Sequence, residues 1–216
     1  MIRLHYHPGN ASLAPHIVLR ELGLPFELLL VDRAHDAHKS PAYLKLNPNG
    51  LIPVLEDGPL VLYETLAVCL HLVDRHGAGR LLAPPGSDAR AQALKWLVWM
   101  SNTLQTTLMH YFYPARVLGT AEGEAAQQVR AFAQQSVGTQ LQQLDTLLAG
   151  HGGPWLLGDE FGLADIYGWM LGRWTRGFDR APARDYPQLG PWLQRVMARP
   201  SVQQVLAAEG LQPPWV

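Results

Sequence analysis

The sequence predicts an α/β domain followed by an all-helical domain. Strand-like and helix-like runs alternate through residues 1–76, whereas no strand pattern follows residue 87. The segment between them, GAGRLLAPPGS at residues 77–87, is rich in glycine and proline, which is typical of a linker. We therefore expect an α/β domain at residues 1–76, a linker at 77–87 and a helical domain at 88–216.

The first domain is predicted to begin with a strand, a helix and a second strand. Short apolar runs predict strands at residues 2–6 and 26–31. Residues 15–22 between them predict a helix that Gly23 and Pro25 end. The crossover of such a βαβ unit should be right-handed.

A short helix, a hairpin and a longer helix complete the first domain. The hairpin joins residues 54–56 to 60–62 through an Asp57-Gly58 turn, and the helix covers residues 64–76. This order is typical of a thioredoxin-like sheet, although the chain has no Cys-x-x-Cys motif.

Every segment predicted after the linker is helical. The ranges are residues 88–118, 122–148, 161–178, 189–198 and 201–208. The first range repeats apolar residues at helical spacing along one buried face, formed by Leu94, Leu97, Ser101, Leu104 and Leu108. We expect these helices to form a bundle.

The composition indicates a globular protein that does not bind nucleic acid. The 216 residues are 48% hydrophobic and 16% charged, with a net charge of −1, so they can fill a core and carry no basic stripe for nucleic acid. The single cysteine, Cys69, forms no internal disulfide and is predicted to be buried and inert. No signal-peptide-like or membrane-spanning apolar run is present, so we expect a cytoplasmic protein without a membrane partner.

Two stretches of the first domain suggest a site for a peptide-like ligand. A cis Ile52–Pro53 bond would expose the Ile52 N–H and C=O as a pair, which could hold an extended peptide; a trans bond at a strand entrance is the alternative. Glu64 and Thr65 begin a helix, where a carboxylate is attracted, or they form an ordinary N-cap.

Asp165 opens a helix of the second domain. It lies three residues after Gly162, whose N–H it could accept as in a capping box. We expect a structural role for it.

Five segments together resemble a known family. HPGNASLAPHIVLRELGLPFELLLVD, NPNGLIPVLEDG, LYETLAV, WLLGDEFGLADIYGW and ARPSVQQVLAAEGL are similar, in this order, to stretches of the cytosolic glutathione transferases, most closely the bacterial beta class. The resemblance implies a thioredoxin-like domain with a helical bundle domain, glutathione as co-substrate, a detoxifying transfer reaction and a homodimer.

The resemblance also implies roles for individual residues. Ile52, before cis Pro53, would hold the cysteinyl backbone of glutathione. Glu64 and Thr65 would hold its γ-glutamyl end. The glycyl carboxylate would meet a basic side chain after the second strand, with Lys39 as our choice and His35 and His38 also in range.

The chain departs from the beta-class pattern at three positions. Ala11 stands where that class has a cysteine, so a mixed disulfide with glutathione is excluded there. Gln105 replaces an expected histidine, and Val98 replaces an expected asparagine. Asn102 and Gln105, one turn apart on the same helix, are predicted to contact glutathione.

The expected chemistry is stabilisation of the glutathione thiolate at the start of the first helix. Ser12 is our first candidate for the hydroxyl donor to sulfur, or it is a plain N-cap. Asn10 is the second candidate, through its amide, and Tyr6 the third. The second substrate should be a small hydrophobic electrophile.

The electrophile pocket is predicted from an aromatic run and a later tryptophan, of which Met109, Tyr113 and Trp174 are our chosen contacts. Such a run could instead be core. Two other functions stay open, namely glutathione-dependent reduction of disulfides or peroxides without a protein cysteine, and a non-catalytic scaffold.

The positions of the histidines in the sequence predict no metal site. His5 and His7 share one face of a strand but have no acidic or cysteine partner nearby in sequence. His71 and His76, like His35 and His38, are expected to be solvated or partnered side chains.

Overall fold

The computed structural model describes residues 1–216 and divides into two compact units. The sheet unit contains residues 1–84 and 197–213, and the helical unit contains residues 85–196 and 214–216. The last helix of the chain therefore belongs to the sheet unit. The domain limits predicted from the sequence, residues 1–76 and 88–216, stay a prediction.

The sheet unit has the predicted thioredoxin-like order. Its elements are β1 (Ile2–Tyr6), α1 (Leu13–Leu22), β2 (Phe26–Leu30), η1 (Ala37–Lys39), α2 (Pro41–Leu44), β3 (Val54–Asp57), β4 (Leu60–Tyr63), α3 (Thr65–His76) and α10 (Pro200–Ala208). The strand order is β2-β1-β3-β4, with β1 parallel to β2 and β3 antiparallel to β1 and β4. This arrangement confirms the βαβ unit and the hairpin.

The β3–β4 turn lies one residue later than predicted. Asp57 still pairs with Leu60, so Gly58 and Pro59 form the two-residue loop. Gly58 has φ 63°, which glycine adopts without a steric penalty.

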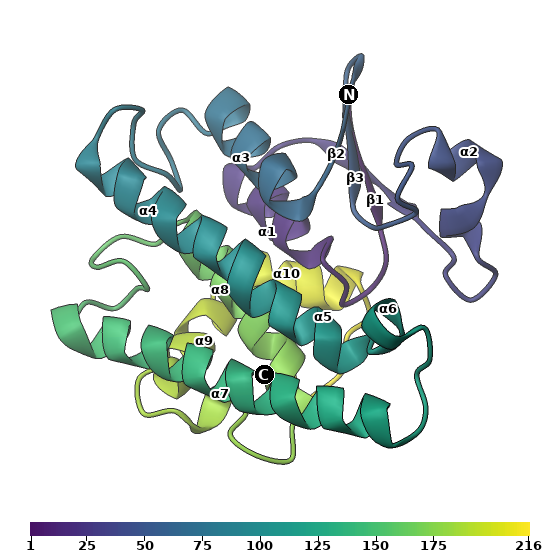
Figure 1. The fold of residues 1–216 in the computed structure, drawn as a ribbon. Coiled ribbons are helices and arrows are strands. Elements are labelled where there is room, and N and C mark those ends of the chain that lie inside the picture. Colours follow the sequence, from purple (N-terminus) through teal and green to yellow (C-terminus); the bar gives the residue numbers. More distant parts are fainter. The chain divides into compact units, whose positions relative to one another are not determined.

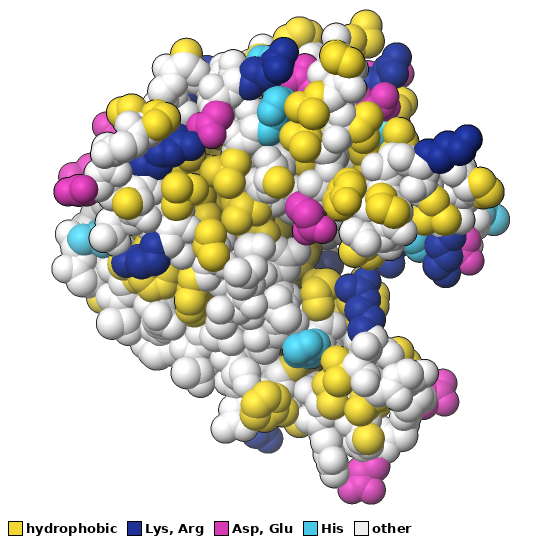
Figure 2. All heavy atoms as spheres, turned by 45° about the horizontal axis from the view of Figure 1, so that its top comes forward, with side chains coloured by type: hydrophobic (Ala, Val, Ile, Leu, Met, Phe, Trp, Pro, Cys, Tyr) yellow, Lys and Arg dark blue, Asp and Glu magenta, His cyan; other side chains and the backbone are white.

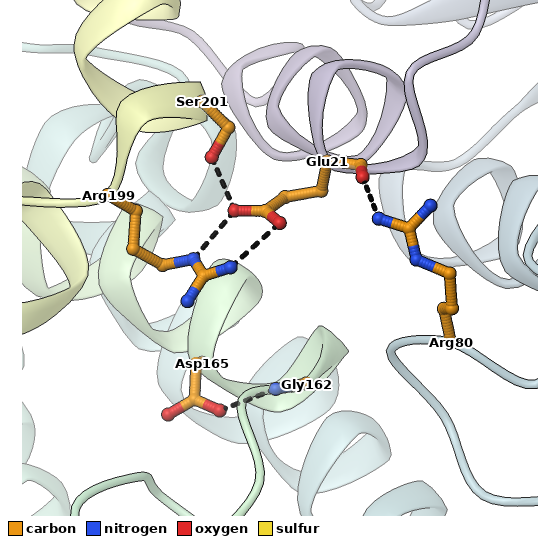
Figure 3. A network of polar contacts seen from close by, with 6 residues as sticks. All are labelled: Glu21, Arg80, Gly162, Asp165, Arg199 and Ser201. Carbon is orange, nitrogen blue, oxygen red and sulfur yellow. Dashed lines mark hydrogen bonds and ion pairs between the residues drawn. The ribbon is translucent and has the colours of Figure 1, made fainter.

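Helix α1 packs against α3 and α10 inside the sheet unit (Figure 1). It begins at Leu13 rather than at residue 15, and most of its residues are buried. Figure 3 shows how α10 is attached: the Glu21 carboxylate accepts two hydrogen bonds from Arg199, at 2.6 and 2.9 Å, and one from Ser201. The Arg80 guanidinium also donates to the Glu21 carbonyl.

The helical unit contains α4 (Asp88–Trp99), the π-helical segment η2 (Met100–Gln105), α5 (Thr106–Phe112), α6 (Ala115–Leu118), α7 (Glu124–His151), α8 (Leu163–Trp174), η3 (Thr175–Gly177), η4 (Ala183–Asp185) and α9 (Leu189–Met197). The prediction of a single helix at residues 88–118 is wrong. The observed helix is widened at η2 and ends before Pro114, because proline cannot continue the hydrogen-bond pattern of the helix.

The surface carries no large field of one sign on the face in Figure 2. Lysine and arginine side chains stand apart there, with acidic side chains among them. No helix combines the length and apolar character that a membrane crossing requires.

Candidate functional site

The loop between β1 and α1 is folded by its own backbone. Gly9 has φ 68°, the Asn10 N–H donates to the His7 carbonyl at 3.1 Å, and the Leu13 N–H donates to the Asn10 carbonyl at 3.0 Å. The Asn10 Oδ1 accepts the Ala11 N–H at 2.6 Å. Asn10 is half-buried, and its Nδ2 has no hydrogen-bond partner within the chain, so it remains available to a ligand.

The Ser12 hydroxyl is used inside the same loop. Ser12 is completely buried, and its Oγ accepts the His7 N–H and donates to the His7 carbonyl, both at 3.2 Å. It does not cap α1. A ligand could receive a hydrogen bond from Ser12 only after the contact with the His7 carbonyl is broken.

A buried carboxylate anchors the loop from the far end of the chain. Glu209 Oε2 accepts the Gly9 N–H at 2.8 Å, and Glu209 Oε1 lies 2.8 Å from His16 Nδ1. The side chains of His16 and Glu209 are fully buried. This contact leaves no local signal in the sequence, because about 200 residues separate the partners.

The Ile52–Pro53 bond is cis, as predicted. The Ile52 N–H and C=O make no hydrogen bond within the chain. The preceding carbonyl, that of Leu51, accepts hydrogen bonds from Tyr43 Oη at 2.9 Å and Asn47 Nδ2 at 2.8 Å. Ile52 thus presents an unpaired backbone donor and acceptor on a firmly held segment.

Glu64 has an unusual backbone conformation at the start of α3. Its φ is 72°, a value that non-glycine residues rarely adopt, and strained residues of this kind cluster at functional sites. The Glu64 side chain is exposed and has no partner within the chain, and Thr65 beside it is buried. The pair does not form the side-chain cap that was the alternative interpretation.

The three basic residues after β2 have different environments. The exposed His35 side chain lies 2.6 Å from Asp32 Oδ2, and Lys39 Nζ lies 2.9 Å from Asp36 Oδ1. His38 is mostly buried, and its Nδ1 has no hydrogen-bond partner. Burial, followed by the charges of Arg33 and Lys39, lowers the pKa of His38.

Asn102 and Gln105 both lie in the π-helical segment of the helical unit. Asn102 is exposed, whereas Gln105 is half-buried and its Oε1 accepts a hydrogen bond from the Tyr167 hydroxyl. Single π turns are frequent at functional sites, and this local widening was not visible in the sequence pattern.

The aromatic residues of the helical unit form a partly exposed cluster. Phe112 is 41% exposed and lies between Tyr113 and Trp174, with ring centroids 6.4 and 6.5 Å away. Trp174 is itself buried, Met109 is half-buried, and the Arg116 guanidinium covers the Tyr113 ring at 4.4 Å. Phe112 is thus the most exposed ring of the cluster.

Comparisons with known families match both halves of the chain. The glutathione S-transferase N-terminal domain model matches residues 11–75, and the C-terminal domain model matches residues 99–200. The chain is 30% identical to glutathione S-transferase GstA of Escherichia coli O157:H7, over 98% of this chain and all of that protein. It is 33% identical to glutathione S-transferase GST-4.5 of Xanthomonas campestris, over 97% of this chain and all of that protein.

Other similar proteins include one named for a different activity and two solved structures. The disulfide-bond oxidoreductase YfcG of Escherichia coli K12 is 29% identical over 95% of this chain and 94% of that protein. A glutathione transferase structure from Methylococcus capsulatus Bath superposes with a TM-score of 0.84 at 32% identity, over 98% of this chain and all of that one. A homologue from Sulfitobacter with bound glutathione superposes with a TM-score of 0.84 at 26% identity, over 98% of this chain and 99% of that one.

Proposed function

We propose that the side-chain amide of Asn10 is the group that stabilises the glutathione thiolate. The premise is that the chain belongs to the glutathione S-transferase family and is an enzyme of that class with glutathione as its co-substrate. The carrying observation is that Asn10 Nδ2 is unpaired, whereas the Ser12 hydroxyl is buried and committed to His7.

One hydrogen-bond donor can supply the free energy that stabilises the glutathione thiolate. A thiol has a pKa of about 8.5, and a hydrogen bond to a charged group contributes about 1.5–3 kcal/mol. Together with the positive end of α1, one amide donor lowers the thiol pKa by about 1–2 units. A large fraction of bound glutathione would then be the nucleophilic thiolate at neutral pH.

The rest of the tripeptide has matching partners in the sheet unit. The unpaired N–H and C=O of Ile52 beside Pro53 suit the cysteinyl backbone. The free carboxylate of Glu64, next to Thr65, suits the γ-glutamyl ammonium group. Lys39 is the charged group for the glycyl carboxylate, because its exposed side chain is tied only to Asp36.

The second substrate is a small hydrophobic electrophile. The partly exposed cluster around Phe112, with Met109, Tyr113 and Trp174, supplies apolar contacts for it. Asn102 and Gln105 of the π-helical segment add polar contacts for glutathione. We further propose a cytoplasmic homodimer with a role in detoxification, on the ground that the chain matches transferases over 97–98% of its length.

The test compares Asn10→Ala with Ser12→Ala and Tyr6→Phe in conjugation of glutathione to an aryl halide. Asn10→Ala should lower kcat/KM about 10- to 100-fold, which corresponds to about 1.4–2.7 kcal/mol of thiolate stabilisation, and should move the pH–rate profile to higher pH. The dissociation constant for glutathione should change only a few-fold, because one contact of many is lost.

Ser12→Ala is the matched control. It should lower the free energy of unfolding by about 1–2 kcal/mol, because two buried hydrogen bonds are lost, while the folded variant retains turnover. Loss of turnover in folded Ser12→Ala with normal turnover in Asn10→Ala would return the donor role to Ser12. Loss of turnover in folded Tyr6→Phe, with normal turnover in Asn10→Ala, would instead assign the donor role to Tyr6.

Glutathione-dependent reduction is the second candidate function. It is favoured by the disulfide-bond oxidoreductase among the relatives and by Ala11, which leaves no protein thiol in the loop to be trapped as a mixed disulfide. Assays with an aryl halide, a small disulfide and a hydroperoxide separate the two functions. A kcat/KM at least tenfold higher for the disulfide than for the aryl halide would favour reduction.

A further inference from the structure

A second cluster of chemically active side chains lies in the sheet unit at the β3–β4 turn. Asp57 Oδ2 lies 2.9 Å from His71 Nε2 and 2.8 Å from His76 Nε2. The three candidate ligand atoms all lie within 4.8 Å of one another. We propose that Asp57, His71 and His76 form a binding site for a divalent transition metal, with Zn²⁺ as the preferred ion.

The ligand set fits this class of metal. Two imidazole nitrogens and one carboxylate oxygen suit Zn²⁺ and Co²⁺, whereas Ca²⁺ and Mg²⁺ prefer oxygen ligands throughout. Three protein ligands leave a fourth position of a tetrahedral ion open to water.

The geometry requires only a small adjustment. Ligand bonds of about 2.0–2.1 Å place the ligand atoms of a tetrahedral zinc site about 3.3 Å apart. Both histidine nitrogens are already aimed at the same carboxylate oxygen, at 2.8–2.9 Å. An ion therefore enters by displacing the shared protons and moving each histidine nitrogen about half an ångström from the carboxylate oxygen. The two nitrogens, which lie within 4.8 Å of each other, would settle at about 3.3 Å.

The helix brings the two histidines to the carboxylate from different sides. Residues five apart on an α-helix differ in direction by about 140°. The imidazole rings are accordingly close to perpendicular, with an interplanar angle of 85° and centroids 6.2 Å apart. The side chains of His71 and His76 are 16% and 23% exposed, so the cluster is partly shielded yet reachable from solvent.

One competing cation is present. Arg75 Nε lies 3.4 Å from the same Asp57 oxygen, but its side chain is 59% exposed and can turn into solvent when a metal binds. Burial would raise the pKa of Asp57, but the hydrogen bonds from His76 and His71 and the neighbouring charges hold it below its usual range. Besides Arg75, the basic side chains paired with the Asp57 carboxylate are His71 and His76 themselves.

A bound metal would join the hairpin to α3 away from the proposed glutathione contacts. Asp57 is at the end of β3 opposite Pro53, about 13 Å along the chain. His76 is at the end of α3 opposite Thr65, about 16 Å along the helix. The expected consequence is stabilisation of the sheet unit rather than a change in chemistry.

The experiment uses the untagged full-length chain, treated with EDTA and dialysed, and titrated with ZnCl₂ and CoCl₂ at neutral pH. Calorimetry should show saturable binding of one Zn²⁺ per chain and an increased thermal midpoint, with no response to MgCl₂. Co²⁺ should give the visible absorption of a tetrahedral site. Binding should weaken as the pH falls, because the imidazoles must be deprotonated.

Variants locate the ion. His71→Gln and His76→Gln should each weaken Zn²⁺ binding at least tenfold, whereas His35→Gln, which removes an exposed imidazole also paired with a carboxylate, should leave it unchanged. The proposal is overturned if the native chain shows no saturable binding, or if both variants bind as the native chain does. Lower stability of the metal-free variants without any zinc effect would also overturn it, since the cluster would then be a hydrogen-bonded clamp only.

Discussion

Each unit of this protein contains a buried carboxylate that links segments distant in sequence, but these two carboxylates, Asp165 and Glu209, serve different segments. In the helical unit, Asp165 accepts the N–H groups of Leu156 and Gly162, at 2.7 and 2.9 Å, and the indole N–H of Trp192 at 2.7 Å. In the sheet unit, Glu209 holds Gly9 and His16. Asp165 joins a helix start to the core, whereas Glu209 fixes the loop that carries Asn10. The same chemistry thus stabilises a fold in one unit and a proposed reactive loop in the other.

The largest effect is expected from Asp165→Ala. Two buried donors and one half-buried donor would lose a charged acceptor, which should reduce the free energy of unfolding by about 5 kcal/mol. Denaturant unfolding measures the change, with the exposed Asp159→Ala as the control in the same region. Molecules that remain folded should bind glutathione normally, and weakened binding would contradict a purely structural role.

Glu209→Ala should lower the free energy of unfolding somewhat less than Asp165→Ala does, but it should also weaken glutathione binding. Leaving the Gly9 N–H and His16 without their acceptor should lower the free energy of unfolding by about 4 kcal/mol. The displaced loop should raise the dissociation constant for glutathione several-fold, as calorimetry would measure. Glu209→Gln retains an acceptor oxygen for Gly9 and should restore part of the affinity. Unchanged binding in Glu209→Ala would remove the distinction between the two carboxylates.

A smaller and pH-dependent effect is expected at Glu21. Burial would raise the pKa of Glu21, but the hydrogen bonds from Arg199 and Ser201 and the charge of Arg199 hold it below its ordinary value. The stabilisation is therefore complete above the pKa of the unfolded chain, about 4.3, and is lost as the pH falls through the folded-state pKa. Glu21→Gln should lose about 1 kcal/mol at pH 7 and show a shallower decrease between pH 5 and 3. Parallel acid-unfolding curves for the two proteins would contradict this.

The smallest effect concerns Cys69, in the interior of α3. The side chain is fully buried, and burial raises the pKa of its thiol. An aromatic disulfide reagent should therefore modify no thiol in the native chain and one thiol after denaturation. Rapid reaction of the native protein would show that the sheet unit opens locally.

The sequence alone was sufficient for the features that depend on neighbours along the chain. Short apolar runs located the strands, and apolar residues at helical spacing located most helices, within a few residues, because burial imposes these patterns. The contact between Asp165 and the Gly162 N–H was predicted because its partners are three residues apart. The cis Ile52–Pro53 bond and the family also followed from local motifs.

Only the tertiary structure decided which polar atoms are free and which are occupied. The sequence favoured Ser12 as the sulfur donor, yet the fold uses its hydroxyl within the loop and leaves the Asn10 amide unpaired. Neither the Glu209 anchor nor the approach of His71 and His76 to Asp57 could be predicted, because chain folding brings these groups together from distant positions. A pattern of residue types records which surface is buried, but hydrogen bonds depend on the directions and distances of individual atoms, and these are fixed only when the elements pack.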